Sequence, residues 1–427
     1  MDLSIASILL IDGLSNGAIY ALLGLATVLL FTITRVIFIP QGEFVAFGAL
    51  TLALLQNRQV PGTVWLLLML AGLAALQELV NGLRAGRGLP AVLKSMAIVL
   101  AYPLAISGVT FVVAPMGLPL VVQALLAIAL VVPLGSLVYR LAYESIADAS
   151  VLVLLIVSVG VHFILAGLGL IFFGAEGFRT PPFWDERFNL GPVLLSGQAV
   201  ITMLATAALM ALMWLFFERT LRGRALRATA VNRLGARLMG ISTVNAGRLS
   251  FTLAAFIGAL SGLLIGPTTT IFYDSGFLIG LKGFVAAVFA GLASYPQAAI
   301  GALALGILEA FGAFWSSAFK EVIVFTAILK HRLGEQLVLI GEEMGDGLTF
   351  FAEGGIIHLS FSGAAVRYST AFHDWAGGRV DETTPAEIAE RVVPAGVLDL
   401  NRVWVAHSDD VETLDLFCRE VLDNLNP

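Results

Sequence analysis

Long apolar segments separated by short polar connections fill the first three quarters of the chain. A membrane-spanning helix needs about 20 mostly apolar residues to cross a hydrocarbon core about 30 Å thick. Segments of this kind lie at 5–34, 36–56, 62–80, 93–114, 117–139, 149–173, 192–217, 248–271, 279–293 and 297–316. The pattern predicts an all-α polytopic membrane helix bundle with about nine to eleven hydrophobic segments.

Two of these segments, 36–56 and 279–293, are short or interrupted. A broken or re-entrant helix leaves backbone groups unpaired, so it is tolerated at membrane depth only where protein buries it. An eleventh apolar piece, 322–329, is too short to span alone and is followed by Lys330. Either of the two segments is therefore a candidate for a broken or re-entrant helix, and the sequence does not decide whether 322–329 completes a last crossing.

Lysine and arginine residues mark the cytoplasmic side of a membrane protein. Seven arginines surround the connection between the seventh and eighth segments: Arg219, Arg222, Arg224, Arg227, Arg233, Arg237 and Arg248. Counting the segments backward places five more basic residues on that side: Arg35, Arg84, Arg87, Lys94 and Arg140. The opposite loops hold only Arg58, Arg179 and Arg187. This bias predicts a cytoplasmic 219–248 loop and an N-terminus on the outer side.

Composition divides the chain in two. Hydrophobic residues make up 58% of it and charged residues 13%, about half the usual share of charge, which argues against a soluble enzyme, a disordered chain or a nucleic-acid binder. Residues 331–427 hold 6 basic and 17 acidic residues, which leaves 18 and 13 for residues 1–330. We predict a transmembrane domain over 1–330 and an acidic soluble segment over 331–427.

The acidic segment has the pattern of a small α+β module. Residues Ile356–Phe361 alternate like a strand, Thr384–Glu387 forms a capping box, and 411–425 has one apolar helical face. Its histidines and aspartates lack metal-ligand spacing, and Ser360 and Ser362 lack the Gly-x-Ser-x-Gly elbow. We expect no metal and no catalytic residue. Three alternatives stay open for this segment: a regulatory or partner-binding module, an accidental gene fusion or altered reading frame without a role, and a membrane-tethered enzyme with its site here.

The energy source of such a bundle is not encoded in a phosphate-binding loop. A P-loop places a lysine directly after glycine, where it reaches the β- and γ-phosphates of the nucleotide. The four lysines, Lys94, Lys282, Lys320 and Lys330, follow leucine or phenylalanine instead. We therefore expect one of three alternatives: the chain uses an ion gradient, it depends on a separate ATPase subunit, or it acts as a passive pore.

Four charged residues fall within the predicted membrane segments. Asp12 lies in the first turns of its segment, and Glu43 lies at the break of the second. Lys282 and Glu309 lie on neighbouring hairpin arms, where they can pair. Buried carboxylates are typical of ion-coupled carriers. These residues therefore indicate a neutralised structural pair, side chains that extend to the membrane interface, or a secondary carrier with a proton relay.

The basic loop is the second place where the chain could receive energy. Leu226 and Leu234 belong to an apolar face flanked by arginines, which predicts a short amphipathic helix in 220–247. Gly235 is expected to interrupt this helix, and Gly240 to end a second turn. Such a segment docks into a groove on a partner or lies on anionic headgroups, and its composition favours neither.

Three stretches of the chain resemble a known family. They are Asp12–Leu22, Gln41–Phe44 and the loop motif that runs from Gly223 to Ile241. Together they are similar to the permease subunits of the branched-chain amino acid ABC transporter family, the high-affinity bacterial uptake type. Further similarity lies at 280–284, 291–296 and 306–309.

The resemblance implies a role for each stretch. The loop would contact the ATPase, through Arg222, Gly223, Arg224, Arg227, Asn232, Arg237 and Gly240. The polar residues within the membrane would be Asp12, Asn16, Tyr20, Glu43, Lys282 and Glu309.

It also implies a setting for the whole chain. The expected partners are a second permease subunit, in a homodimer or heterodimer, two cytoplasmic ABC ATPases, an extracytoplasmic solute-binding protein and the lipid bilayer of a bacterial inner membrane. ATP would be used by the partner subunits, with no cofactor bound by this chain. The solute would be a branched-chain amino acid or a similar small polar molecule.

The chain departs from the family pattern in three places. Asp12 stands where the family usually has asparagine, and residues 60–115 contain one or two additional hydrophobic segments. After Thr326 the acidic segment replaces the usual end of the last span. This departure leaves the completeness of the last span open.

Overall fold

The computed structural model describes residues 3–190, 193–289 and 295–315, and three strands at 348–353, 356–361 and 367–371. The chain divides into two units, Met1–Val324 and Phe325–Pro427, and each is described by itself. The apolar piece at 322–329, the helices expected at 384–392 and 411–425, and the domain boundary at 330 lie outside the described residues. These features therefore remain predictions from the sequence.

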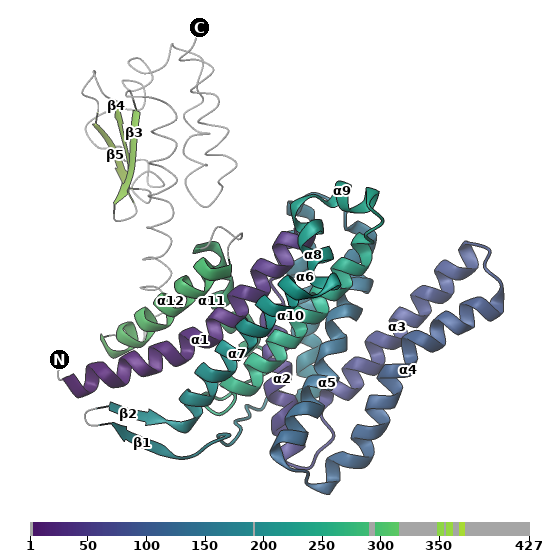
Figure 1. The fold of residues 1–427 in the computed structure, drawn as a ribbon, viewed down its shortest axis with the longest axis horizontal. Helices are drawn as coiled ribbons and strands as arrows, with labels where there is room; N and C mark the ends of the chain where they lie inside the picture. Colours follow the sequence, from purple (N-terminus) through teal and green to yellow (C-terminus); the bar gives the residue numbers. More distant parts are fainter. Residues whose placement is uncertain are drawn as a thin grey trace. The chain divides into compact units, whose positions relative to one another are not determined.

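The first unit is a bundle of helices (Figure 1). Its helices are α1 (Leu3–Thr34), α2 (Gln41–Gln56), α3 (Gly62–Arg84), α4 (Leu89–Val113), α5 (Leu120–Val138), α6 (Val151–Phe173), α7 (Gly197–Arg219), α8 (Leu221–Val231), α9 (Arg233–Leu238), α10 (Thr243–Ile265), α11 (Ser275–Phe289) and α12 (Tyr295–Trp315). Short turns η1 (Ala114–Met116), η2 (Tyr139–Tyr143) and η3 (Glu144–Ile146) and an antiparallel hairpin of β1 (Arg187–Leu190) and β2 (Val193–Ser196) connect them.

Within the described residues, eight helices are long and apolar enough to cross a membrane. They are α1, α3, α4, α5, α6, α7, α10 and α12. The predicted helical membrane bundle is therefore confirmed. The predicted segment at 248–271 is displaced, because α10 already begins at Thr243 and ends at Ile265. Arg248 thus lies within a helix and not in the loop.

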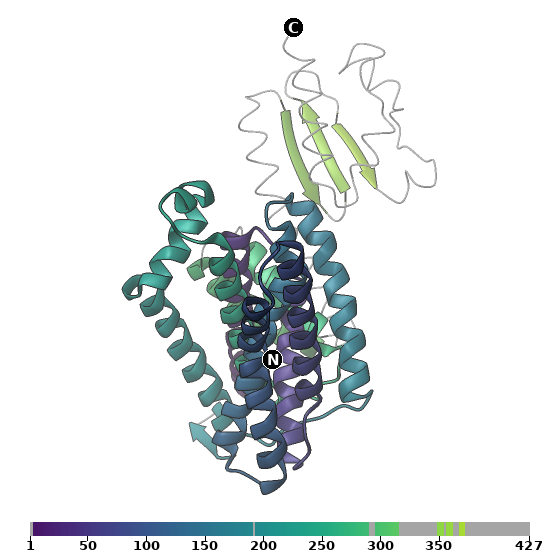
Figure 2. The ribbon, with the colours of Figure 1, turned by 90° about the vertical axis from the view of Figure 1, so that its right-hand side faces the viewer.

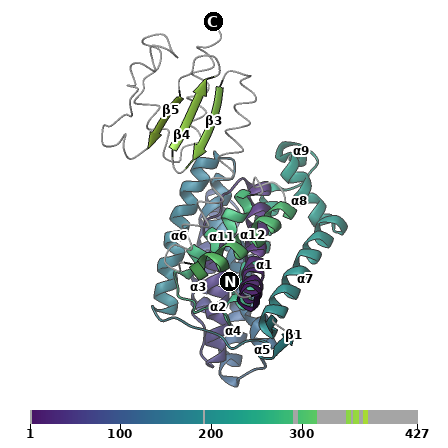
Figure 3. The same cartoon turned by 90° about the vertical axis from the view of Figure 1, so that its left-hand side faces the viewer.

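Helix α1 forms the centre of the bundle. It packs against α12, α10, α11 and α7, and its residues from Ala18 to Leu30 are almost all buried. A helix that is apolar on every side is covered either by protein or by lipid, and α1 is covered by protein. Figure 3 shows α1 between α6 and α7, and Figure 2 shows these two helices on opposite flanks of the bundle.

Basic residues collect at one end of the bundle, where α8 and α9 lie (Figure 1). We call this the cytoplasmic end, following the arginine distribution, and the opposite one the outer end. At the cytoplasmic end Glu78 of α3 forms ion pairs with Arg87 and with Arg140 of η2. The additional hydrophobic sequence at 60–115 forms the hairpin of α3 and α4.

Helices α2 and α11 are too short to cross the membrane alone. They have 16 and 15 residues, or about 24 and 22 Å of helix, against a hydrocarbon core about 30 Å thick. The Nε2 atom of Gln41 donates a hydrogen bond of 2.9 Å to the carbonyl of Ala254, the middle residue of α10. Helix α2 therefore begins near the middle of the membrane.

These two half-helices run in opposite directions. Helix α2 lies beside α10 toward the outer end, where Gly262 faces Val45. Helix α11 lies beside α1 toward the cytoplasmic end, where Gly283 contacts Leu23. The segments 35–40 and 266–274, which precede the half-helices, complete the two crossings. Both segments thus contain a short helix preceded by irregular chain, the broken arrangement that the sequence allowed for either of them; residues 290–293 of the ninth segment lie outside the described residues.

The two half-helices touch each other through bare backbone. A Cβ atom on Gly42 would lie 1.7 Å from the carbonyl oxygen of Gly276, and one on Gly280 would lie 2.8 Å from the backbone nitrogen of Gly42. Small residues permit such close approach of helices in lipid. The start of α2 is thereby packed against the first turns of α11.

The second unit contains a three-stranded antiparallel sheet, in the order β3 (Leu348–Glu353), β4 (Ile356–Phe361) and β5 (Arg367–Ala371). Residue Leu348 pairs with Phe361, and Ile356 pairs with Ala371. The strand predicted at Ile356–Phe361 is confirmed.

We expect Gly42→Val to prevent assembly of the bundle, because no side chain fits between the half-helices. Gly72→Val is the matched control, since Gly72 of α3 is exposed and no atom lies within 4 Å of its Cβ position. The measurement is the yield of monodisperse protein after detergent extraction, followed by thermal unfolding. Equal yields and unfolding temperatures for the two variants would contradict the packing argument.

Candidate functional site

The first polar centre lies at the start of α2. Glu43 is fully buried, and its Oε1 atom lies 3.0 Å from Nδ1 of His162. His162 has eleven residues of α6 on either side, so this pair lies near the middle of the membrane. The ring of His162 also packs against Phe277 of α11, with 4.9 Å between ring centroids. The centre therefore joins both half-helices to α6.

This centre is not fully satisfied by the described residues. The Oε2 atom of Glu43 and the Oε1 atom of Gln41 are buried and have no hydrogen-bond partner there. A buried oxygen without a hydrogen-bond partner lowers the stability of the folded protein by about 1–3 kcal/mol. Unsatisfied groups at mid-membrane depth are typical of functional positions.

The second polar centre joins α1, α11 and α12. Glu309 accepts a hydrogen bond of 2.7 Å from the hydroxyl of Tyr20 and one of 2.6 Å from Nζ of Lys282. Lys282 also lies 3.4 Å from the hydroxyl of Tyr20 and 5.4 Å from the centre of its ring. All three residues are buried. The expected pairing of Lys282 with Glu309 is present, with Tyr20 as a third member.

Two predicted membrane residues lie outside these centres. Asp12 is exposed and Asn16 is half-buried, both in the outer half of α1. Gly13 and Gly17 beside them face the backbone of α12. The stretch Asp12–Leu22 thus contributes chiefly the close contact between α1 and α12.

The basic loop folds into two short helices with defined ends. The side chain of Thr220 caps α8, and Asn232 caps α9 through a hydrogen bond of 2.8 Å to the backbone nitrogen of Gly235. After α9, Gly240 has a positive φ of 80°, and the amide of Ile241 bonds back to the carbonyl of Ala236. This glycine-terminated end is a Schellman motif.

Two details of the predicted loop were wrong. The interruption falls at Asn232 and not at Gly235, because the amide side chain of Asn232 competes with the helix for the backbone of the next turn. Leu226 and Leu234 do not share one buried face, since Leu226 is buried and Leu234 is exposed. Gly240 does end the second helix, as expected.

Arginines tie α9 and α10 to the connection between α5 and α6. Arg237 makes two hydrogen bonds, of 2.9 and 3.0 Å, to the carboxylate of Asp148. Arg233 donates to the carbonyl of Ala147. Arg248 pairs with Glu144 through both carboxylate oxygens. Two-pronged arginine–carboxylate pairs fix orientation as well as distance.

The remaining predicted loop residues take no part in the ion pairs with the connection between α5 and α6. Arg227 pairs with Glu218 at the end of α7. Arg222 and Arg224 are exposed and form no ion pair with a described residue. Gly223 lies against the carbonyl of Phe216, where a Cβ would come within 2.2 Å. Its lack of a side chain permits the sharp corner between α7 and α8.

Apolar side chains project from α8 and α9 into the surroundings. Leu238 is 80% exposed and Met239 is 82% exposed, and Val231 and Leu234 are exposed beside them. An apolar patch of this kind, rimmed by arginines, marks a contact surface. We call Val231, Leu234, Leu238 and Met239 the apolar loop patch.

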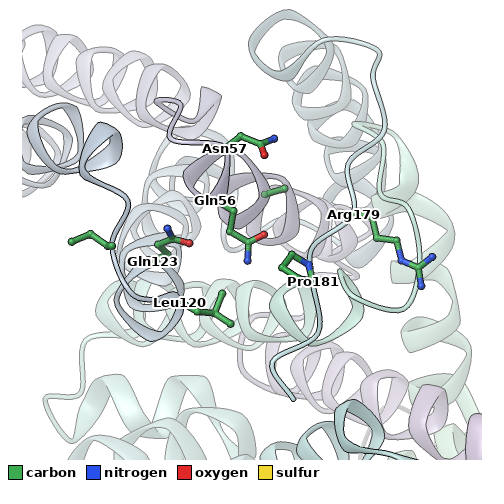
Figure 4. Close-up of a pocket in the computed structure, with 8 residues that line it drawn as sticks. Gln56, Asn57, Leu120, Gln123, Arg179 and Pro181 are labelled. Carbon is green, nitrogen blue, oxygen red and sulfur yellow. The ribbon is translucent and has the colours of Figure 1, made fainter. Parts of the chain in front are cut away.

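A cavity of about 440 Å³ opens at the outer end of the bundle (Figure 4). Amide side chains of Gln56, Asn57 and Gln123 line it, together with Pro181 and Arg179. None of the site residues predicted from the sequence lines this cavity. Arg179 is engaged elsewhere, since its Nε atom donates to the carbonyl of Pro267.

Sequence reasoning missed three residues of these centres. His162 lies in the long apolar run of α6, and its position in the middle of that run is the signal that could have found it. Glu144 and Asp148 are the acidic residues of a short cytoplasmic connection. They lie on the same side of the membrane as the seven arginines at 219–248, which makes them the candidates for the ion-pair partners of those arginines.

Comparison with known proteins places these features in context. The family described as the permease component of branched-chain amino acid transport systems matches residues 88–330. This range includes the basic loop, Lys282 and Glu309, and it excludes the stretches at 12–22 and 41–44.

Two curated relatives illustrate the similarity. The chain is 31% identical over 203 residues to LivH of Escherichia coli, a high-affinity branched-chain amino acid transport system permease protein, across 46% of this chain and 66% of LivH. It is 30% identical over 220 residues to BraD of Pseudomonas aeruginosa, a protein of the same description, across 49% of this chain and 72% of BraD.

One solved structure, PsaBC from Streptococcus pneumoniae in complex with Fab, is similar over 74% of this chain and 85% of that chain. The sequence identity is 16% and the TM-score is 0.32. A structural similarity this weak does not establish a shared fold or a shared function.

We expect Lys282→Met to destabilise the bundle by about 3–5 kcal/mol, because removing one partner leaves a buried charge uncompensated. Glu309→Met should be comparably harmful. The double variant Lys282→Met/Glu309→Met should recover most of the loss, since apolar side chains of similar size replace both charges. Thermal unfolding of the four proteins in detergent measures this coupling. A double variant no more stable than the single ones would show that the pair does not act as a unit.

Proposed function

Because the chain belongs to the permease-component family of branched-chain amino acid transport systems, we propose that it is the membrane subunit of an ABC importer. It is a multi-pass protein of the inner membrane. The proposed solutes are branched-chain amino acids or similar small polar molecules. Separate ATPase subunits would drive the import by docking on α8 and α9.

The observation that carries this proposal is the apolar loop patch. It lies at the cytoplasmic end, on two short helices whose ends are capped. A pre-shaped helical element with an apolar face suits a groove on a partner protein. Leu238 and Met239 would enter that groove, and Arg222 and Arg224 would meet acidic residues at its rim.

The ion pairs of the loop provide a route for force. Arg237 holds α9 against Asp148, and Arg248 holds α10 against Glu144. Movement of the docked ATPases would therefore be transmitted to the connection between α5 and α6 and to α10 together. Gly223 keeps α8 close to the end of α7, so this helix would follow.

The other components are inferred from the same family membership. Membership of an ABC permease family supports partnership with further ABC components. We propose a second permease subunit, two ATPases that use ATP and a solute-binding protein on the outer side. The chain itself would bind no cofactor, in keeping with its lack of a P-loop lysine.

An ion-coupled secondary carrier and a membrane-tethered enzyme are not favoured. Lys282 and Glu309 neutralise each other, with Tyr20 as an additional donor. This arrangement supports a structural role for Glu309, and His162 likewise engages Glu43. Uptake that survives ATPase deletion but collapses with an uncoupler would revive the carrier alternative.

We expect Leu238→Asp and Met239→Asp to abolish copurification of the ATPases and reduce uptake at least tenfold, because a carboxylate placed in an apolar groove must be desolvated. Met116→Asp serves as the control, since Met116 is 65% exposed at the outer end. The same preparation gives both readouts. Loss of copurification with Met116→Asp, or its persistence in both loop variants, would count against the docking surface.

We expect Arg237→Asp to uncouple ATP hydrolysis from uptake, since α9 would lose its attachment to Asp148 and face a like charge. Asp148→Arg alone should act similarly. The combined variant Arg237→Asp/Asp148→Arg should restore part of the coupling, because it rebuilds the pair in reverse while Arg233, which lies 3.9 Å from Asp148, then faces a like charge. The ratio of solute transported to ATP hydrolysed in proteoliposomes measures the effect. A combined variant as impaired as the singles would argue against this attachment.

A further inference from the structure

The segment that leads into α11 lies within the hydrocarbon depth. Tyr273 lies against Gly169, four residues from the outer end of α6. Phe277 packs on His162 at the middle of the same helix. With a rise of about 1.5 Å per residue, residues 273–277 extend from the outer part of the hydrocarbon core to its middle.

This segment is exposed on one side of the described bundle. Asp274 is exposed, Leu278 is 55% exposed, and Phe272 and Phe277 are exposed beside them. Residues 266–274 are not helical. Part of its backbone is paired within the protein, since Ile271 bonds to Phe178 through both backbone groups and the amide of Phe272 bonds to the hydroxyl of Ser275. Irregular backbone at this depth is still tolerated only where protein buries it or water lines it.

Asp274 strengthens this constraint. A carboxylate within the hydrocarbon core costs at least about 2.5–3.5 kcal/mol when lipid surrounds it. Asp274 forms no ion pair with any residue in the described part of the chain. Phe277, three residues further on, packs against His162, the partner of Glu43. The surroundings of Asp274 must therefore offer water or a positive charge.

We propose that residues 272–278 line the water-filled solute path, and that Asp274 meets the ammonium group of the solute. The inference rests on the proposed importer function and adds the part of this chain that touches the solute. Helix α11 begins directly after Asp274, so its partial positive charge lies beside the carboxylate. A zwitterion such as an amino acid presents both of the complementary charges.

Two other surroundings predict different behaviour. Lipid would leave a side chain at 274 unreactive toward charged reagents in water. A tightly packed second permease chain would also exclude the reagent, and would bring residues at 274 or 278 of two chains close enough to be cross-linked. The solute path alone makes the position reactive in water and sensitive to the solute.

Cysteine accessibility distinguishes these cases, because Cys418 is the only cysteine of the chain. Cys418→Ser gives a cysteine-free background, into which Asp274→Cys and Leu278→Cys are introduced separately. Ile164→Cys and Ile171→Cys are the controls, since these α6 residues are 61% and 73% exposed. The assembled transporter in membranes is treated with a membrane-impermeant methanethiosulfonate that carries a quaternary ammonium group.

We expect cysteine at 274 and 278 to react at least tenfold faster than at 164 and 171. An amino acid known to be transported should slow the reaction at 274. Rates equal to the controls, or cross-linking without modification, would overturn the proposal. The background variant must show ATP-dependent uptake, so failure of the importer function is seen before any cysteine is tested.

The role of the charge has its own test in Asp274→Asn and Asp274→Glu. We expect Asp274→Asn to raise the KM for uptake at least tenfold while ATPase copurification is unchanged, because the amide retains size but not charge. Asp274→Glu should keep most of the activity. Unchanged uptake kinetics in Asp274→Asn would overturn the assignment of Asp274 to the ammonium group, whatever its accessibility.

Discussion

Backbone groups cannot remain unpaired in the hydrocarbon core, and this constraint shapes the middle of the bundle. Two helices begin there, and the chain that leads into α2 is buried at Val36 and Phe38. Gly42 permits the start of α2 to lie directly on Gly276 and Gly280 of α11. Helices α1 and α10 pack against both half-helices or their neighbours, and so help to cover the two interrupted spans.

Each half-helix carries one buried charge, and each charge is paired with a full-length helix. Glu43 of α2 contacts His162 of α6, and Lys282 of α11 contacts Glu309 of α12. A buried pair is weak evidence for stability but defines which elements belong together. Each half-helix is thus joined to a long helix by one polar contact, while α2 also packs along α10 and α11.

The sequence predicted the features that depend on local pattern. The apolar segments, the two interrupted spans and the pairing of Lys282 with Glu309 follow from hydrophobic length and from charges isolated in apolar surroundings. His162 was not predicted, because a lone histidine in a span gives no indication of which helix it faces. The orientation of Leu234 was wrong because it depends on the break at Asn232, where one side-chain hydrogen bond decides between two helix boundaries.

The contacts at the cytoplasmic end of the bundle and those at the middle of the membrane involve the same helices. At the cytoplasmic end, α9 is attached to the connection between α5 and α6, and Arg248 attaches α10 to the same connection. In the middle of the membrane, α10 holds Gln41 through Ala254, and α6 holds Glu43 through His162. Any displacement at α9 that moves α6 relative to α10 must therefore change the two contacts that fix the start of α2. Because α2 lies on the first turns of α11, the same displacement reaches the segment around Asp274.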